Sequence, residues 1–399
     1  MRRLARLALP SALAVLGLAL PGAASATSIP GANGKIVFTS GRDGTAGNDD
    51  AARLWVVDYP GGSPVQVTTQ PTGVQHRHPS WSPDHTKIAY AAGPPFSPTG
   101  SYEIWIKDMV TGAQTKFLDA APHQDHPAWS PDGQSIAYGS NGDIWVKGIA
   151  PGSQPVQLTN NPEIEERPYW SADGSTIWYT RDFGTAMTPD RDIYKKSPVT
   201  PGGTETDVVS GSTNDWQVAA SPDNKRICWL RGGQDSTADI WVGNSDGSDL
   251  HPFANTMGVG EINCVWSPDG SRILYTLGIF SAGDLRTKDF FGNTDLLTTF
   301  SVADHFDGNS DWATNLSPTC DNKTVSTGVN QFIQIQLSCT DPDSGAGAAP
   351  PTPVPIDAVF MDITGKPSHG NIGSLSEDAK LIYTPAKNFK GTDTISYTG

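Results

Sequence analysis

The sequence predicts an all-β protein built mainly from a ring of six small antiparallel sheets, a six-bladed β-propeller. Two observations carry this prediction. Residues 125–159 read as four short strands joined by turns, and their motifs recur along the chain at intervals of 41 to 50 residues. A period in the forties with several strands in each unit is typical of a propeller blade.

The unit in residues 125–159 has turns that can be assigned position by position. Ser130-Pro131-Asp132-Gly133 fits a type I turn, because proline pre-sets φ at the second position and glycine suits the fourth. Asn141-Gly142 predicts a type I′ hairpin, since both residues tolerate positive φ. The alternating apolar and polar residues between the turns predict strands at Trp129 and at residues 135–139, 143–147 and 155–159.

Two columns of residues run in phase through the repeats. The first is a Trp-Ser-Pro-Asp anchor, complete or degenerate at Trp81, Trp129, Trp170, Ala220, Trp266 and Leu316. The second is an aliphatic–aromatic pair at Leu54-Trp55, Ile104-Trp105, Ile144-Trp145, Ile193-Tyr194, Ile240-Trp241 and, more weakly, Leu285-Arg286. We interpret the tryptophans as core residues, because stacked repeats need a recurrent apolar anchor. The aspartates of the anchors are interpreted as turn formers rather than ligands.

Each end of the repeat region holds an incomplete unit. Residues 34–40 read as the second strand of a unit without a first strand, and the anchor Leu316-Ser317-Pro318 has no blade after it. We therefore expect a C-terminal strand to complete the N-terminal sheet, so that five whole blades and one shared blade close the ring over residues 34–318. Closure leaves few sheet edges open to aggregation.

The Trp-Ser-Pro-Asp-Gly turn, the Ile-Ala-Tyr strand and the Asp-Ile-Trp strand resemble the WD40-like repeats of TolB-type propellers over about residues 34–318. TolB is a periplasmic component of an envelope complex, so the resemblance implies a protein-binding or scaffold role. The N-terminal domain of TolB has no counterpart between Ala26 and the first blade. Similar repeats also form the non-catalytic propeller half of some serine peptidases.

The N-terminus reads as a secretory signal peptide of residues 1–26. Three arginines precede an apolar run from Leu7 to Leu20, and Ala24-Ser25-Ala26 supplies a cleavage site. This pattern leaves the Sec and Tat export routes both open. Later stretches fall short of the ~20 apolar residues that a membrane span needs. We therefore expect a secreted protein or one of the periplasm or cell envelope.

The composition narrows the class of partner. The formal net charge is −15, although only 17% of the residues are charged. Nucleic acids and anionic membrane surfaces require clustered lysine and arginine, so both are disfavoured as partners. The acidity favours solubility outside the cell. We expect a monomer whose partner is a protein or an envelope or extracellular polymer.

The inner strands of a propeller place their variable residues around one mouth of the central channel, where polar groups converge on a concave surface. The alternative is a solvated funnel rim without a specific ligand. Four histidines in this region stand beside Asp125 and Glu166, but they lack a recognised ligand spacing, so no metal site is predicted. The predicted ligand-binding residues are His76, His78, Asp125, His126, Glu166, Arg167, Asp215, Trp216 and Trp312.

The sequence carries no recognised catalytic motif. Gly-x-Ser-x-Gly, His-Glu-x-x-His, P-loop and Gly-x-Gly-x-x-Gly patterns are all missing. Glu165 and Glu166 are weak as a glycosidase pair, because neighbours along a strand point to opposite faces. The sequence therefore predicts a non-enzymatic binding or scaffold protein without a cofactor. The alternative is an extracellular hydrolase related to propeller peptidases or glycosidases.

The character of the chain changes at residues 319–399. Phe332–Leu337 and Ala358–Ile363 alternate as strands, and Pro367-Ser368-His369-Gly370 is followed by two Tyr-Thr-containing strands. Together they resemble bacterial cadherin-like, Ig-type β-sandwich repeats. The resemblance implies a spacer or adhesion module with one more strand than this segment holds. Either the sequence stops short at Gly399, which we favour, or a partner adds the missing strand. Calcium is a possible ligand at Asp341-Pro342-Asp343, but a calcium-free turn is favoured, because calcium needs six or more oxygens.

Four cysteines suit an exported protein. Cys320 and Cys339 flank the first strand of the C-terminal segment and are the predicted disulfide, which would contribute ~3 kcal/mol in the chain-entropy model. Cys228 and Cys264 fall in neighbouring blades. The sequence leaves open whether these two pair or stay as buried thiols.

Overall fold

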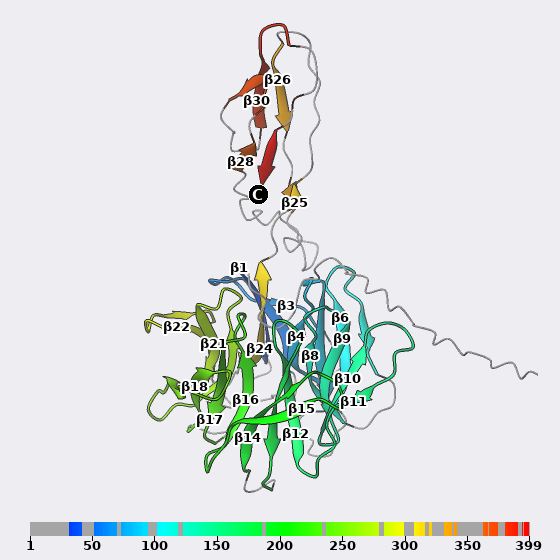
Figure 1. Ribbon diagram of the computed structural model, residues 1–399, viewed down its shortest axis with the longest axis vertical. Coiled ribbons are helices and arrows are strands. Elements are labelled where there is room, and N and C mark those ends of the chain that lie inside the picture. The colour runs from blue at the N-terminus through cyan, green and yellow to red at the C-terminus, as the bar shows by residue number, and fades with distance from the viewer. Residues whose placement is uncertain are drawn as a thin grey trace, which may run out of the picture.

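The computed structural model describes two parts of the chain (Figure 1). In the repeat region it describes residues 32–41, 52–69, 73–94, 102–118, 123–185, 189–233, 237–278, 283–298 and 307–315. In the C-terminal segment it describes residues 319–320, 331–336, 339–340, 362–365, 367–373, 380–389, 393 and 395–398. The regular elements within these residues are all strands. They include no helix long and apolar enough to cross a membrane. The predicted signal peptide lies outside the described residues.

Six four-stranded antiparallel sheets make up the repeat region, and five of them consist of consecutive strands. The first two are β4 (Gln75–Trp81), β5 (Lys87–Gly93), β6 (Glu103–Asp108) and β7 (Gln114–Lys116), then β8 (Gln124–Trp129), β9 (Ser135–Ser140), β10 (Asp143–Gly148) and β11 (Val156–Gln157). The next two are β12 (Ile164–Trp170), β13 (Ile177–Asp182), β14 (Arg191–Ser197) and β15 (Thr204–Val209), then β16 (Asp215–Ala220), β17 (Arg226–Arg231), β18 (Asp239–Asn244) and β19 (His251–Ala254). The fifth is β20 (Glu261–Trp266), β21 (Arg272–Leu277), β22 (Asp284–Asp289) and β23 (Thr294–Leu296).

The sixth sheet joins the two ends of the repeat region. Its strand order is β24 (Asp307–Asn315), β1 (Ala32–Ser40), β2 (Arg53–Val57) and β3 (Val65–Gln66). Figure 1 shows β24, in yellow, alongside β1, in blue, and the register sets Ile36 opposite Trp312. The predicted closure of a six-bladed ring by one shared blade is confirmed.

The register corrects the position of the last anchor. Trp81 and Trp129 each end an inner strand opposite an isoleucine of the following strand, and the other anchors pair in the same way. In the shared blade the residue in this place is Trp312, opposite Ile36. The prediction of Leu316 as the last anchor was therefore wrong by four positions. Trp312 escaped notice because Ala313 and Thr314 follow it instead of serine and proline.

The anchor turns have the predicted chemistry. Ser130 Oγ donates a hydrogen bond to Asp132 Oδ1 at 2.6 Å, and the Gly133 N–H donates to the Ser130 carbonyl at 2.9 Å. Gly133 has a φ of 67°, and His85 and Asn224 adopt left-handed φ values of 54° and 59° at the same position of their turns. The serine–aspartate bond recurs at 2.6 Å in the other four turns, so these aspartates act as turn formers.

The tryptophan anchors are core residues, as predicted. Trp129 is 1% exposed and Trp266 is fully buried. The Trp266 indole N–H donates to the Ala219 carbonyl of the preceding blade at 3.1 Å, which ties neighbouring sheets together. The aliphatic column lies deeper still, with every member fully buried: Leu54, Ile104, Ile144, Ile193, Ile240 and Leu285.

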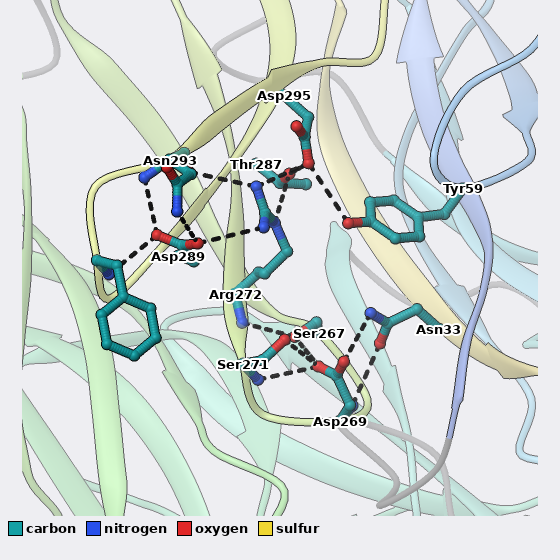
Figure 2. A network of polar contacts seen from close by, with 11 residues as sticks. Asn33, Tyr59, Ser267, Asp269, Ser271, Arg272, Thr287, Asp289, Asn293 and Asp295 are labelled. Carbon is teal, nitrogen blue, oxygen red and sulfur yellow. Dashed lines mark hydrogen bonds and ion pairs between the residues drawn. The ribbon is translucent and has the colours of Figure 1, made fainter.

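Polar contacts secure the seam between the fifth sheet and the shared blade. Figure 2 shows the Asn33 side chain paired with Asp269, donating to its carboxylate at 3.0 Å and accepting its N–H at 3.2 Å. In the same view Arg272 lies 2.7 Å from Asp295, which also accepts a hydrogen bond from the Tyr59 hydroxyl. Residues more than two hundred positions apart thus close the ring with side chains as well as backbone.

The C-terminal segment forms sheets of its own. They pair β25 (Thr319–Cys320) with β27 (Cys339–Thr340), β28 (Asp362–Gly365) with β31 (Ser396–Thr398), and β26 (Ile333–Gln336) with β30 (Lys380–Pro385) and β29 (Gly370–Ile372). The register sets Cys320 opposite Cys339, while the disulfide itself stays a prediction. The candidate calcium residues Asp341 and Asp343 lie outside the described residues.

Candidate ligand site in the axial channel

Each inner strand of the ring carries one residue in the left-handed conformation, three positions before its anchor. The pairing with the next strand is shifted by a bulge at this place in every blade. Non-glycine residues rarely adopt positive φ, so its recurrence in all six blades is a built feature of the ring. The six residues, called here the axial ring, are His78 (φ 50°), His126 (51°), Arg167 (58°), Gln217 (55°), Asn263 (59°) and Asn309 (47°).

The axial ring surrounds a cavity of about 100 Å³. Five of its members line this cavity, and the sixth, Asn263, accepts a hydrogen bond from Gln217 Nε2 at 2.6 Å. The ring consists of two imidazoles, one guanidinium and three amides. The wall also includes prolines, an alanine and valines, and a space of this size admits a side chain, a small anion or a hydrated ion.

Asp125 joins two members of the axial ring from neighbouring blades. His78 Nδ1 lies 2.7 Å from Asp125 Oδ1, and His126 Nδ1 lies 3.9 Å from Oδ2. The two imidazole rings stack with their centroids 3.8 Å apart. A third imidazole, His123, is half exposed and lies 4.0 Å from the same carboxylate.

Burial and neighbouring charges set the protonation of this cluster. Burial lowers the pKa of His78 and His126, and the cations of Arg77 and Arg167 act in the same direction. Burial alone would raise the pKa of Asp125, but the adjacent imidazoles hold it well below its usual range. At neutral pH the cluster therefore consists of two neutral imidazoles and one carboxylate.

Arg167 is positioned by the other predicted residues near it. Its Nε lies 3.5 Å from Glu166 Oε1, and Arg191 lies 3.7 Å from the same oxygen. The guanidinium stands 5.1 Å from the centre of the Trp216 ring, which is itself buried. Glu166 and Trp216 thus hold Arg167, and it is Arg167 that lines the cavity.

The remaining three predicted residues lie within the blades. His76 is fully buried, 2.8 Å from Thr68 Oγ1, and burial with the nearby Arg53 charge lowers its pKa to about 3. Asp215 is fully buried and accepts hydrogen bonds from Arg231 at 2.6 and 3.1 Å. Trp312 is 3% exposed and belongs to the core. These side chains are not in the wall of the axial cavity, and their ligand-binding role stays a prediction.

The predicted set omitted Gln217, Asn263 and Asn309. A signal for them exists in the sequence, because each lies three residues before an anchor once Trp312 is counted as one. The question of the two propeller cysteines is answered by the structure, in which Cys228 and Cys264 are both free and buried. Cys264 lines the cavity, and its thiol donates to the Gln217 carbonyl at 3.4 Å.

Comparisons with known proteins agree with this architecture. The family model of the TolB beta propeller domain matches residues 26–294, and that of the bacterial Ig domain matches residues 315–398. No curated protein matches the chain. The limits 34–318 and 319–399 expected from the sequence stay a prediction.

Similar solved structures include TolB from Acinetobacter baumannii, at 21% identity and a TM-score of 0.54 over 72% of this chain and 69% of that one. A protein assigned as TolB in Agrobacterium tumefaciens is 17% identical, with a TM-score of 0.50 over 71% and 99% of the two chains. Hydrazine synthase of Kuenenia stuttgartiensis is 11% identical, with a TM-score of 0.57 over 71% and 47%. At these identities the likeness concerns the fold, which hosts both a TolB and an enzyme. The match over residues 26–294 shows that the chain belongs to the TolB beta propeller domain family, with a bacterial Ig domain after the propeller.

Proposed function

We propose that this chain is an exported, non-catalytic binding protein that receives a segment of a protein or polymer in its axial channel. The observation that carries the proposal is the axial ring, in which a strained backbone conformation recurs in six blades and five of the six polar residues line one cavity. Backbone strain of this kind costs about 1–3 kcal/mol at each site and is concentrated where it serves function. The family and the signal-peptide pattern support a location in the cell envelope or extracellular space.

The chemistry of the axial ring favours a ligand with carboxylates or backbone carbonyls. Its imidazole, guanidinium and amide groups are mainly hydrogen-bond donors, and none of the six is acidic. Asp311 also lines the cavity, but its carboxylate accepts hydrogen bonds from the backbone N–H groups of Trp81 and Trp312. An extended segment that inserts one acidic side chain or a terminal carboxylate matches both the donors and the small cavity. The C-terminal domain then acts as a spacer or adhesion module.

The contacts of the imidazoles support binding over nucleophilic catalysis. Activation of a serine or cysteine needs an imidazole within hydrogen-bond reach. Within the described part of the chain, His78 and His126 make no hydrogen bond with a hydroxyl or thiol. The extracellular hydrolase inferred as the alternative from the sequence is tested on the same variants, with peptide and glycoside substrates.

The test compares two double variants. Arg167→Ala with Gln217→Ala removes two donors of the axial ring, whereas Gln154→Ala with Lys225→Ala removes two exposed side chains elsewhere. Partners are captured from envelope extract of the source organism on the wild-type protein, purified, and titrated against each variant. We expect the ring variant to bind at least about tenfold more weakly, a loss of about 1.4 kcal/mol, and the control to bind within about twofold.

Equal affinity of the wild-type protein and the ring variant for every captured partner would refute the axial channel as the binding site. Turnover of a peptide or glycoside that the ring variant loses would instead establish the hydrolase. Thermal unfolding of each variant verifies that the propeller remains folded.

A further inference from the structure

Sequence spacing gave no metal prediction, yet the fold brings His78, Asp125 and His126 together. We infer that these three residues bind one divalent first-row transition-metal ion in the wall of the axial channel. His78 comes from β4, and the other two come from β8 of the next blade. The site therefore exists only when the two blades are packed against each other.

The geometry of the three side chains fits a shared ion. One donor atom from each residue lies within 4.8 Å of the others. Bonds of about 2.0–2.2 Å to one ion place neighbouring ligand atoms about 3.0–3.5 Å apart, so side-chain movements of about 1 Å complete the site. The stacked rings present their Nδ1 atoms to the same carboxylate at 2.7 and 3.9 Å, so an ion bound there replaces the hydrogen bond between His78 and Asp125.

His126 supplies an independent indication. In the described part of the chain its Nδ1, which faces the Asp125 carboxylate at 3.9 Å, makes no hydrogen bond. Coordination through Nδ1 gives this nitrogen a partner on the side where the carboxylate already lies.

The donor set selects the class of ion. Two imidazoles with one carboxylate suit zinc, iron, cobalt, nickel or copper, whereas calcium requires an all-oxygen site with six or more ligands. The nearby cations are engaged elsewhere: Arg167 lies 3.5 Å from the Glu166 carboxylate, and Arg77 stands 4.6 Å from the Tyr102 ring centre and donates to Gln75. Their repulsion of a dication is thereby reduced.

Three protein ligands leave coordination positions open, as in catalytic rather than structural metal sites. Since His78 and His126 line the axial cavity, an acidic group inserted into it would reach the ion. This last step rests on the proposed function, whereas the metal site itself does not.

The test uses the untagged full-length protein, stripped with chelator, and Co²⁺ as the probe. Titration calorimetry and visible absorption of the bound cobalt report stoichiometry and affinity without any channel ligand. We expect one ion per chain, and at least about tenfold weaker binding for His78→Asn, Asp125→Asn and His126→Asn. The matched control is His251→Ala, because His251 also lies near an aspartate, at 3.8 Å from Asp249, but is exposed.

The site is overturned if the wild-type protein binds less than one equivalent of Co²⁺ at about 1 mM Co²⁺, roughly the weakest useful affinity. It is also overturned if His126→Asn binds Co²⁺ as well as the wild type, or if His251→Ala loses as much affinity as the ligand variants. The melting temperature of each variant is measured without metal, so that a misfolded variant is recognised and excluded. The site is supported if Co²⁺ raises the melting temperature of the wild-type protein and of His251→Ala but not that of the variants at His78, Asp125 and His126. Because no partner is present, failure here leaves the channel-binding proposal to its own test.

Discussion

Removal of the Trp129 side chain tests whether the repeated tryptophans hold the blades together. Trp129 is 1% exposed and packs with Ala89 of the preceding sheet and Ile136 of its own, with Ile106 and Phe117 beside them. Trp129→Ala deletes a whole buried indole between two sheets that are fixed on both sides by the closed ring. The void cannot collapse fully, so we expect a loss of ~3–5 kcal/mol.

Trp145→Ala is the matched control, because Trp145 belongs to the same sheet but is only partly buried. Less apolar surface is lost there, and its cost is expected to be lower by at least ~1 kcal/mol. Urea unfolding followed by circular dichroism measures both variants. The assignment of the anchors to the core would be contradicted by either of two results. One is a free energy of unfolding of Trp129→Ala within ~0.5 kcal/mol of the wild type, and the other is a loss no larger than that of Trp145→Ala.

Three further predictions follow from the ring closure, the turns and the C-terminal domain. Burial raises the pKa of Asp311 from 3.8 to about 6, so its ionisation costs stability as pH rises between these values. Asp311→Asn removes that cost. Urea unfolding should therefore show the free energy of unfolding of the wild type falling by up to about 3 kcal/mol relative to the variant between pH 4 and pH 7. A difference that stays constant with pH would contradict this. Gly133→Ala and Gly152→Ala both force alanine into left-handed φ, but only Gly133→Ala brings the new Cβ to 3.0 Å from Pro83. Calorimetry should therefore show the larger loss of unfolding free energy, on the order of 1–2 kcal/mol or more, for Gly133→Ala. Non-reducing peptide mapping should recover Cys320 linked to Cys339, and Cys320→Ser should cost ~3 kcal/mol in the C-terminal domain; a free Cys320 would disprove the pairing.

The sequence by itself determined the blades and the closure of the ring. Turns such as Ser130–Gly133 and Asn141-Gly142 specify their backbone locally, and the pattern between them is strand-like whatever lies further away. The unpaired strand at residues 34–40 also required a partner from the other end of the repeats. The placement of Trp129 in the core was also predictable, because repeats that stack on one another bury the apolar residue that recurs in each of them.

The tertiary structure decided which inner-strand residues face the channel, although their constant spacing from the anchors is visible in the sequence. Side chains alternate between faces along a regular strand, but a left-handed residue at each bulge breaks the alternation. Gln217 therefore reaches the axis, while Asp215 and Trp216, predicted as ligands, turn into the blade. The meeting of His78 with Asp125 was likewise beyond the sequence. Their 2.7 Å contact spans two blades, and its geometry depends on how the closed ring packs neighbouring sheets.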